Sequence, residues 1–421
     1  MADARAPVEV MTFGCRLNLV ESEAIRQAAT AAGRTNLVAV NTCAVTAEAV
    51  RQARQAIRRL KRDRPNAEIV VTGCAGETER DRFAAMPEVS QIIGNTVKTE
   101  AESWRLQAPA PGDIFAERRA PAALSDAGAG HTRGFVQVQT GCDHRCTFCI
   151  IPFGRGNSRS VAEEDVIASI RRLVSTGHAD VVLTGVDLTS WGTDLPGTPR
   201  LGTLVRAILL AVPELKRLRL SSIDSIEADD DLMRALAEEE RLMPHLHLSL
   251  QAGDDLILKR MKRRHSFADA VAFCARVRAL RPDFVFGADI IAGFPTETED
   301  MFARSLALVE ACGITHLHVF PFSPRPGTPA ARMPPVPGPT IRDRASRLRA
   351  KGDAMLKAHL DSQIGRTLVV LAERGNRGRT ADFTPVRLPA GTAPGTFWRF
   401  AAESHDGTML VADATNLVAA G

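Results

Sequence analysis

The stretch TGCDHRCTFCIIP, residues 140–152, decides the fold that this chain can adopt and the chemistry that it can support. Its three cysteines, Cys142, Cys146 and Cys149, are separated by three and then by two residues. Thiolates bind zinc or iron–sulfur clusters, but structural zinc takes four protein ligands, and no matching pair of Cys or His follows. Three ligands on a short loop suit a [4Fe–4S] cluster with one open iron. We therefore expect a small molecule bound at that iron, with structural zinc as the alternative.

The composition is that of a soluble globular protein with two or three domains. The chain has 421 residues, of which 45% are hydrophobic and 24% are charged. No apolar run reaches the length of a membrane span and the N-terminus lacks a signal-peptide core, so we expect no membrane and a cytoplasmic protein. In a reducing compartment the eight cysteines favour metal binding or catalysis over disulfides. The net charge of +4 is compatible with a nucleic-acid partner but does not establish one.

Short apolar runs alternate with amphipathic stretches at the start of the chain. Residues 8–13, 37–41 and 68–72 have the pattern of buried parallel strands, and residues 91–94 form a weaker fourth candidate. Residues 18–32 and 47–62 have helical spacing. This order predicts an N-terminal α/β domain, residues 1–106, in which helices cover both faces of a parallel sheet.

A second α/β series follows a segment rich in Ala, Pro and Gly, residues 107–132, which predicts a linker with at most one strand at residues 113–117. The expected strands are residues 135–139, 181–186, 217–222, 246–251, 285–291 and 316–322. The expected helices between them are residues 162–176, 201–212, 229–241, 267–280 and 298–312. Six strands joined by helices predict a partial (β/α)6 barrel over residues 133–360, with its chemistry at the C-terminal ends of the strands.

The end of the chain has a different pattern. Proline-dense residues 324–339 and a basic helix at residues 340–360 close the barrel domain. Residues 361–421 contain short apolar runs broken by Gly and Pro, at residues 367–373, 384–388, 396–400 and 408–412. They predict a small C-terminal β-barrel.

Three further cysteines occupy equivalent positions in the N-terminal domain. Cys15, Cys43 and Cys74 each come just after a predicted strand. Because the carboxyl ends of parallel strands converge on one crevice, these thiols are placed to hold a second cluster with an open iron. The alternative, three cysteines used as small core residues, does not explain why all three fall at strand ends. Cys274 and Cys312 lie within apolar helical stretches and are expected in the core.

The two cysteine triplets resemble those of the radical S-adenosylmethionine (SAM) methylthiotransferases. The resemblance covers essentially the whole chain and includes TFGCRLN (12–18), LTGVD (183–187), LSLQAGDD (248–255), DIIAGFP (289–295) and FSPRPGT (322–328). It implies two [4Fe–4S] clusters, of which the one at the catalytic triplet in residues 140–152 binds SAM. It also implies that sulfur is inserted into a carbon–hydrogen bond and then methylated by a second SAM.

Within this family, GCDHRCTFCIIPFGRGNSRS (141–160) is most similar to the type that modifies C2 of N6-threonylcarbamoyladenosine at position 37 of tRNA, next to the anticodon. The C-terminal part resembles a TRAM domain, a small β module that holds RNA. We expect a monomer that binds the anticodon stem-loop and takes electrons and sulfur from unidentified donors. Three alternatives stay open: an enzyme for an aspartate of a ribosomal protein, an enzyme for isopentenyladenosine in tRNA, and a non-catalytic iron–sulfur protein that binds tRNA.

Four side chains are candidates for holding SAM. In the family Phe148 would lie near the adenine, and Asp187, Gln251 and Asp289 come near the ends of expected barrel strands. The alternative for these three is ordinary polar capping at a barrel rim. His144, inside the cysteine loop, is expected to be a spacer.

Two groups of basic residues are candidates for RNA phosphates. Arg155, Arg159 and residues 262–264 flank the barrel face, although residues 262–264 equally suit a solvated helix end. Near the C-terminus, charge combines with aromatic rings in a pattern typical of single-stranded RNA binding, with a plain charged surface as the alternative. These residues are Arg374, Arg377, Arg379, Phe383, Trp398 and Arg399.

Overall fold

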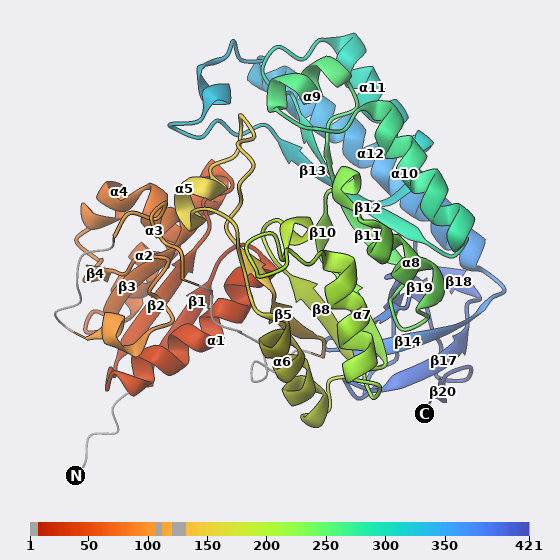
Figure 1. Cartoon of the computed structure of the whole chain (residues 1–421), viewed down its shortest axis with the longest axis horizontal. Coiled ribbons are helices and arrows are strands. Elements are labelled where there is room, and N and C mark those ends of the chain that lie inside the picture. The colour runs from red at the N-terminus through yellow and green to blue at the C-terminus, as the bar shows by residue number, and fades with distance from the viewer. Residues whose placement is uncertain (1–6, 106–111, 120–131, 421) are drawn as a thin grey trace.

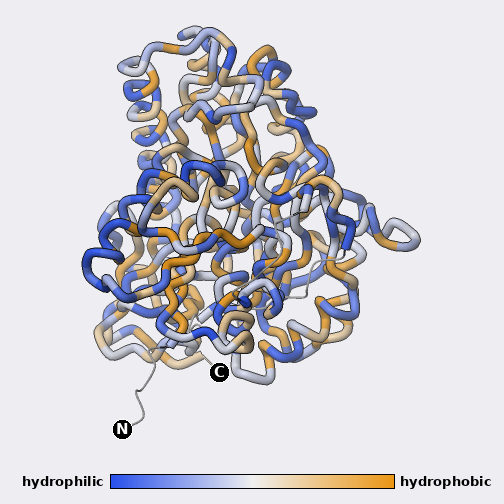
Figure 2. Tube along the Cα trace, turned by 90° about the vertical axis from the view of Figure 1, so that its left-hand side faces the viewer, coloured by the Kyte–Doolittle hydropathy of each residue, from blue (hydrophilic) through white to orange (hydrophobic). Residues whose placement is uncertain are grey.

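The computed structural model describes residues 7–105, 112–119 and 132–420. The chain forms an N-terminal α/β part, a central barrel and a C-terminal sheet, which lie side by side in Figure 1. Hydrophobic stretches run through the inside of the trace and hydrophilic stretches lie mostly at its periphery (Figure 2). Within the described residues, every helix is too short or too polar to cross a membrane.

The N-terminal part is a parallel sheet with the strand order β1-β2-β3-β4. Its central strand, β2, is buried along its whole length, as its apolar sequence predicts. The side chain of Thr46 accepts a hydrogen bond from the N–H of Ala49 at 3.1 Å and so caps α2. The elements are β1 (Glu9–Thr12), α1 (Arg16–Ala31), β2 (Leu37–Thr42), α2 (Ala47–Asp63), β3 (Glu68–Gly73), α3 (Cys74–Thr78), α4 (Arg80–Ala84) and β4 (Gln91–Ile92).

The central part confirms the predicted partial barrel of six parallel strands. It consists of the sheets β5-β8-β9 and β10-β11-β12-β13. Only Ser221 separates β9 from β10, so these two segments count as one of the six predicted strands. Leu218 forms a further parallel bridge to Leu242, just before β11. The strands are β5 (Gly134–Gln137), β8 (Asp180–Thr184), β9 (Arg217–Leu220), β10 (Ser222–Ile223), β11 (His245–Gln251), β12 (Val285–Ala292) and β13 (Ile314–Pro321). A short antiparallel ribbon, β6 (Gln139–Thr140) with β7 (Arg159–Ser160), lies at its mouth.

Helices cover the outside of the barrel, and their apolar faces pack against the strands in one continuous core. One predicted helix, residues 267–280, has the same bounds in the structure, because a capping box between Ser266 and Asp269 fixes its start. These helices are α6 (Glu163–Ser175), α7 (Leu201–Ala211), α8 (Asp230–Glu238), α10 (Phe267–Leu280), α11 (Glu299–Ala311) and α12 (Gly338–Gln363). Two shorter helices lie elsewhere: α5 (Ile151–Arg155) packs against α3 of the N-terminal part, and α9 (Asp255–Met261) packs in a separate apolar cluster. Cys274 and Cys312 are fully buried, as expected for core residues.

The candidate strand at residues 113–117 does not form, which agrees with the expectation of at most one strand in the linker. This part of the linker forms a turn, in which the carboxylate of Asp113 accepts the N–H of Phe115 at 2.9 Å. A short aspartate side chain competes in this way with strand pairing for the backbone donor. The rest of the predicted linker, except residues 112–119 and 132, lies outside the described residues.

The C-terminal part is a curled sheet that forms a half-barrel, with the strand order β18-β19-β16-β15-β14-β17-β20. Its small core contains Val370, Val386 and Phe400, and Leu360 of α12 packs against it. The strands are β14 (Thr367–Glu373), β15 (Arg377–Thr380), β16 (Pro385–Arg387), β17 (Phe397–Ala401), β18 (Ser404–His405), β19 (Leu410–Val411) and β20 (Val418–Ala419).

The N-terminal part contacts both edges of the open barrel sheet. Helix α1 packs beside β5 at one edge. At the other edge, past the end of β13, Ser323 accepts the N–H of Ala47 at 3.1 Å, and Arg325 forms a buried ion pair with Glu79. The N-terminal part therefore spans the gap between the first and last barrel strands (Figure 1).

Candidate functional site

The loop that carries Cys142, Cys146 and Cys149 lies between β6 and α5, at the mouth of the barrel. Its middle is attached to the end of α9: the N–H of Thr147 donates to the carbonyl of Met261 at 3.1 Å. The N–H of Cys149 donates to the carbonyl of Cys146 at 3.0 Å, which tightens the loop into a turn. All three thiols are therefore held on one short segment that is fixed to the barrel.

A cavity of about 150 Å³ opens beside this loop. Asp187 comes from the segment after β8 and Gln251 from the end of β11, so the cavity lies at the C-terminal ends of the barrel strands. Gln251 has a φ of 67°, a left-handed conformation that is uncommon outside glycine and is frequent at functional sites. The predicted residues that line the cavity are Cys142, Cys146, Phe148, Cys149, Asp187 and Gln251.

Asp289 is not among the residues that line this cavity. It lies three residues before the end of β12, and its Oδ1 is 2.8 Å from Nε2 of His247 and 3.2 Å from Nδ1 of His318. Burial alone would raise the pKa of Asp289, but the hydrogen bonds from the two imidazoles lower it well below its ordinary value. The structure therefore places Asp289 in a polar cluster with His247 and His318 of the two neighbouring barrel strands, outside the lining of this cavity.

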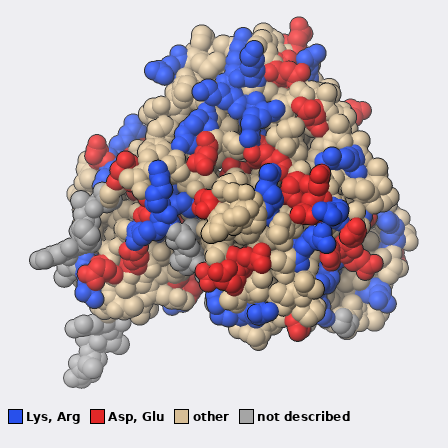
Figure 3. All heavy atoms as spheres, viewed as in Figure 1, with Lys and Arg blue, Asp and Glu red and all other residues tan. Residues whose placement is uncertain are grey.

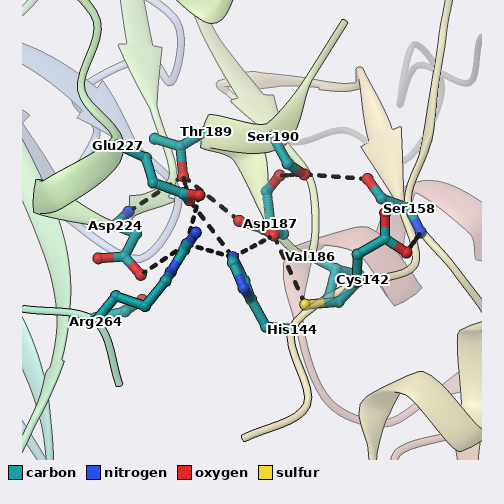
Figure 4. A network of polar contacts seen from close by, with 12 residues as sticks. Cys142, His144, Ser158, Val186, Asp187, Thr189, Ser190, Asp224, Glu227 and Arg264 are labelled. Atoms are coloured by element: carbon teal, nitrogen blue, oxygen red, sulfur yellow. Dashed lines mark hydrogen bonds and ion pairs between the residues drawn. The ribbon is translucent and has the colours of Figure 1, made fainter. Parts of the chain in front are cut away.

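His144 is not a spacer, and that expectation was wrong. Its Nε2 lies 3.0 Å from Oδ2 of Asp187 and 3.5 Å from Oε2 of Glu227, and Asp187 Oδ2 is also 3.7 Å from Sγ of Cys142 (Figure 4). Hydrogen bonds to the two carboxylates raise the pKa of His144 to about 10. The side chain thus ties the cysteine loop to two strand ends. The spacing within the loop gave no sign of this, because both partners are remote in sequence.

Arg263, which was a candidate for RNA, lies beneath the same loop. Its Nη2 pairs with Oδ2 of Asp224 at 2.8 Å, and its Nη1 lies 3.9 Å from Sγ of Cys146. The side chain is largely buried. It is therefore placed to stabilise negative charge on sulfur and is not available to a phosphate at the surface.

The second triplet lies at the carboxyl edge of the N-terminal sheet. Cys15 directly precedes α1, Cys43 follows β2, and Cys74 begins α3 directly after β3. Gly14 brings two of them together, because a Cβ built there would lie only 2.6 Å from the Cβ of Cys43. Cys74 packs against Gly154 of α5, the helix that directly follows the first cysteine loop. The two triplets are therefore neighbours across the domain boundary.

The residues of both triplets fit iron–sulfur clusters. Burial raises the pKa of Cys43 to about 11 and that of Cys149 to about 12. Burial and the nearby charge of Asp187 also raise the pKa of Cys142. Thiolates at such positions need the positive charge of a bound metal group, and metal binding releases these protons.

A buried charged network lies next to the second triplet and joins the two domains. Arg155 of α5 donates to both carboxylate oxygens of Glu21, at 2.7 and 3.0 Å, and to Oδ1 of Asn18 at 2.6 Å. Nζ of Lys98 donates to Oε2 of Glu21 at 2.5 Å. Arg155 is only 3% exposed. The interpretation of Arg155 as a phosphate ligand is therefore wrong, since its guanidinium holds α1 to α5.

Acid is expected to destabilise the protein through Glu21. Burial by itself raises the pKa of this carboxyl, but Arg155 and Lys98 lower it from 4.5 to about 2. A carboxyl whose pKa is lower in the folded state adds stability above its unfolded pKa and loses it as the pH falls. The unfolding free energy should therefore fall more steeply between pH 4.5 and about pH 2 in the wild type than in Glu21→Gln. Urea titrations across this range measure both slopes, and equal slopes would contradict the prediction.

Comparisons with known proteins agree with this architecture. Residues 136–309 match the model of the Radical SAM superfamily, and residues 7–94 match that of a family described as Uncharacterized protein family UPF0004. The radical SAM methyltransferase TsrM from Kitasatospora setae superposes with a TM-score of 0.51 at 17% identity, over 75% of this chain and 68% of TsrM. That likeness shows the fold.

Two curated relatives span nearly the whole chain. Threonylcarbamoyladenosine tRNA methylthiotransferase MtaB from Rickettsia prowazekii is 46% identical over 93% of both chains. A tRNA-2-methylthio-N(6)-dimethylallyladenosine synthase from Cereibacter sphaeroides is 34% identical over 90% of this chain and 89% of its own length. This chain therefore belongs to the radical SAM tRNA methylthiotransferase family, in its MtaB-type branch.

Proposed function

We propose that this enzyme converts N6-threonylcarbamoyladenosine in tRNA to its 2-methylthio derivative, by sulfur insertion at C2 and SAM-dependent methylation of that sulfur. The observation that carries the proposal is the 46% identity to MtaB over 93% of both chains. The dimethylallyladenosine synthase is less similar, at 34%.

Membership of the radical SAM superfamily implies one [4Fe–4S] cluster and SAM, which together supply the radical that removes a hydrogen atom from the substrate. Cys142, Cys146 and Cys149 would hold that cluster. Phe148 packs edge-on against Phe294, with ring centroids 6.5 Å apart, and forms an apolar wall beside the cavity. Gln251 also lines the cavity and offers an amide that can orient a polar group of SAM.

The second cluster is part of the proposal. Cys15, Cys43 and Cys74 would hold it through three thiolates and leave one iron open for the sulfur that is transferred. Support comes from their position at one sheet edge and from α5, which connects this edge to the first cysteine loop. A substrate carbon between the two triplets would be within reach of both.

Replacing Gly14 by Ala is expected to remove the second cluster alone. Gly14 has a φ of 99°, and a new Cβ would lie 2.6 Å from the Cβ and 2.9 Å from the Sγ of Cys43. Iron should fall from about eight to about four per reconstituted chain. Gly33→Ala is the matched control, because Gly33 has a φ of 75° but open space around it. Iron analysis tests both variants, and about eight iron in Gly14→Ala would contradict the prediction.

The N-terminal part is held against both sides of the barrel site. The contacts of Ala47 with Ser323 and of Glu79 with Arg325 hold the N-terminal part over the last barrel strand. On the other side, Arg155 holds α1 to α5. These contacts would hold the two triplets on either side of one space, where exclusion of water would protect a radical.

Exposed cations beside the mouth would receive the tRNA. Lys and Arg gather on the upper part of the face in Figure 3, where α9 lies. Lys259, Lys262 and Arg264 are exposed there, next to the first cysteine loop. On the C-terminal sheet, Arg374 and Arg399 are also exposed. Neutralisation of phosphates by such side chains gives sequence-independent affinity for the RNA backbone.

Nucleoside mass analysis of tRNA from a deletion strain tests the function. The proposal predicts loss of 2-methylthio-N6-threonylcarbamoyladenosine, with accumulation of the unmethylthiolated nucleoside. Loss of the methylthiolated isopentenyl nucleoside would instead assign the other tRNA branch, and unchanged tRNA would reject both. Release of 5′-deoxyadenosine by the reduced enzyme separates catalysis from simple tRNA binding.

A further inference from the structure

All three parts of the chain meet around one aromatic ring. Phe383 follows β15 in a turn with a φ of 72°, and its ring stacks on His245 of β11 with centroids 4.8 Å apart. Arg219 of β9 donates to the carbonyl of Ala381 in the same turn at 2.8 Å. This turn of the C-terminal half-barrel is therefore fixed against the amino-terminal ends of barrel strands. Phe383 accordingly contacts the barrel, in place of the RNA contact expected from sequence.

Four arginines surround the Phe383 ring. Three of them have other partners as well. Arg133 pairs with Glu373 at 2.8 Å, Arg219 pairs with Asp180 at 2.9 Å, and Arg379 donates to the carbonyl of Phe383 at 3.0 Å. The distances from guanidinium carbon to ring centroid are 6.0 Å for Arg16, 5.1 Å for Arg133, 5.4 Å for Arg219 and 4.4 Å for Arg379.

Arg16 differs from the other three. It is exposed, and its only partners among the described residues are the rings of Phe135, at 5.8 Å, and Phe383. It forms no hydrogen bond or ion pair with any residue that the structure describes. A guanidinium is charged at neutral pH, and Glu373 is a negative group close enough to act on that charge. Arg16 is therefore an exposed residue whose cation has no directly paired carboxylate among the described residues.

The position of Arg16 does not serve the stability of its helix. Arg16 is the first residue of α1, and there is no acidic residue in the first turn. The amino-terminal end of a helix carries partial positive charge, so a cation there is unfavourable. The helix therefore does not explain why a cation stands at position 16, whereas binding of an anion by Arg16 would explain it.

Two imidazoles beside the Phe383 ring each have a ring nitrogen that, among the described residues, is free to form a hydrogen bond. His245 is 9% exposed and His316 contacts Phe383 edge-on, with centroids 6.1 Å apart. Nε2 of each ring is buried without a hydrogen-bond partner among the described residues. Burial, followed by the charges of neighbouring groups, lowers the pKa of both, so they are neutral and each can donate a hydrogen bond. Polar donors thus accompany Arg16.

The charge and the position of Arg16 indicate which part of the substrate it would bind. The backbone of Arg16 follows Cys15 at the proposed second cluster, where C2 of the adenine must receive sulfur, and its side chain extends from there to the rings of Phe135 and Phe383. An N6 substituent that extends from this position along the Arg16 side chain would bring its terminal group to the guanidinium. The threonylcarbamoyl substituent ends in a carboxylate, the group that guanidinium binds with two parallel hydrogen bonds. An isopentenyl substituent has no charge to offer.

We propose that Arg16 binds the carboxylate of the threonylcarbamoyl group and thereby selects this nucleoside over adenosines with uncharged N6 substituents. This assignment rests on the proposed function and identifies the residue that recognises the N6 substituent of the substrate. Arg16 acts as a specificity residue. Cation and carboxylate pair only in the bound complex, so the effect falls on affinity for the modified nucleoside and leaves affinity for the rest of the RNA unchanged.

Binding of four anticodon stem-loop RNAs to the reconstituted enzyme without SAM tests this assignment. The RNAs are identical except for position 37, which carries threonylcarbamoyladenosine, its methyl ester, isopentenyladenosine or adenosine. The wild type should bind the acid about tenfold or more tightly than its ester, a ratio typical of a charge-assisted contact. In Arg16→Gln this ratio should fall to about one while adenosine binding is unchanged, and Arg16→Lys should retain part of it. Arg26→Gln, on the exposed side of the same helix, should behave as the wild type.

Each outcome decides one claim. Equal wild-type affinities for the acid and the ester overturn the carboxylate contact, whatever the variants do. A preference that persists in Arg16→Gln assigns the contact to another residue and overturns the role of Arg16. In both cases turnover of the threonylcarbamoyl RNA by the wild type leaves the proposed function intact. Turnover of the isopentenyl RNA alone overturns the function and the specificity role together.

Discussion

The Cys43→Ala enzyme is expected to lose methylthiolation of tRNA and to keep reductive cleavage of SAM. Cys43 belongs to the triplet at the N-terminal sheet edge, whereas Cys142, Cys146 and Cys149 lie on a separate loop that does not depend on it. Loss of this thiolate would therefore disrupt only the proposed second cluster. Iron should fall from about eight to about four per chain, while 5′-deoxyadenosine is still released under dithionite.

A matched control is available in the core. Cys274→Ala removes a thiol that is fully buried in a helix against the barrel, so iron content and methylthiolation should be unchanged. The result that contradicts the prediction is an unchanged iron content of about eight in Cys43→Ala. Loss of both clusters would equally contradict it, because it would show that the two triplets depend on each other.

Arg155→Met is expected to give the largest loss of stability of any single substitution in the domain boundary. Arg155 makes two hydrogen bonds to Glu21 and one to Asn18, all buried between α1 and α5. Removing one partner of a buried ion pair leaves the other charge without full compensation, which costs about 3–5 kcal/mol. Lys98 still contacts Glu21, so the variant tests whether one cation replaces two.

Chemical denaturation measures this effect, and limited proteolysis shows whether the N-terminal part separates first. Arg51→Met is the control, since Arg51 forms an exposed pair with Glu48 on α2 and its loss should leave the unfolding midpoint nearly unchanged. The expectation is contradicted if the two variants unfold at the same denaturant concentration. Arg155 would then contribute to the boundary through shape alone.

The sequence was most informative where the spacing of hydrophobic residues agreed with the residues that begin and end helices and strands. The buried strands around Val40 and Val71, the helix capped by Ser266 and the parallel order of the barrel strands all follow from local patterns. Strand ends then place cysteines without any knowledge of the packing, because parallel strands share one carboxyl edge. The candidate strand at residues 113–117 does not form because the Asp113 side chain accepts the backbone N–H of Phe115, a contact that the apolar pattern does not register.

The sequence by itself placed two cysteine triplets on two predicted α/β units, and the spacing and strand-end positions of these cysteines indicated iron–sulfur clusters. Tertiary structure decided the partners of the charged residues. His144 was expected to be a spacer and Arg155 an RNA ligand, yet one contacts Asp187 and the other Glu21. Arg16 is left without an ionic partner among the described residues. The spacing of hydrophobic residues is a local property that can be recognised in the sequence. The pairing of charges depends on side chains that are remote in sequence and meet only when the domains pack.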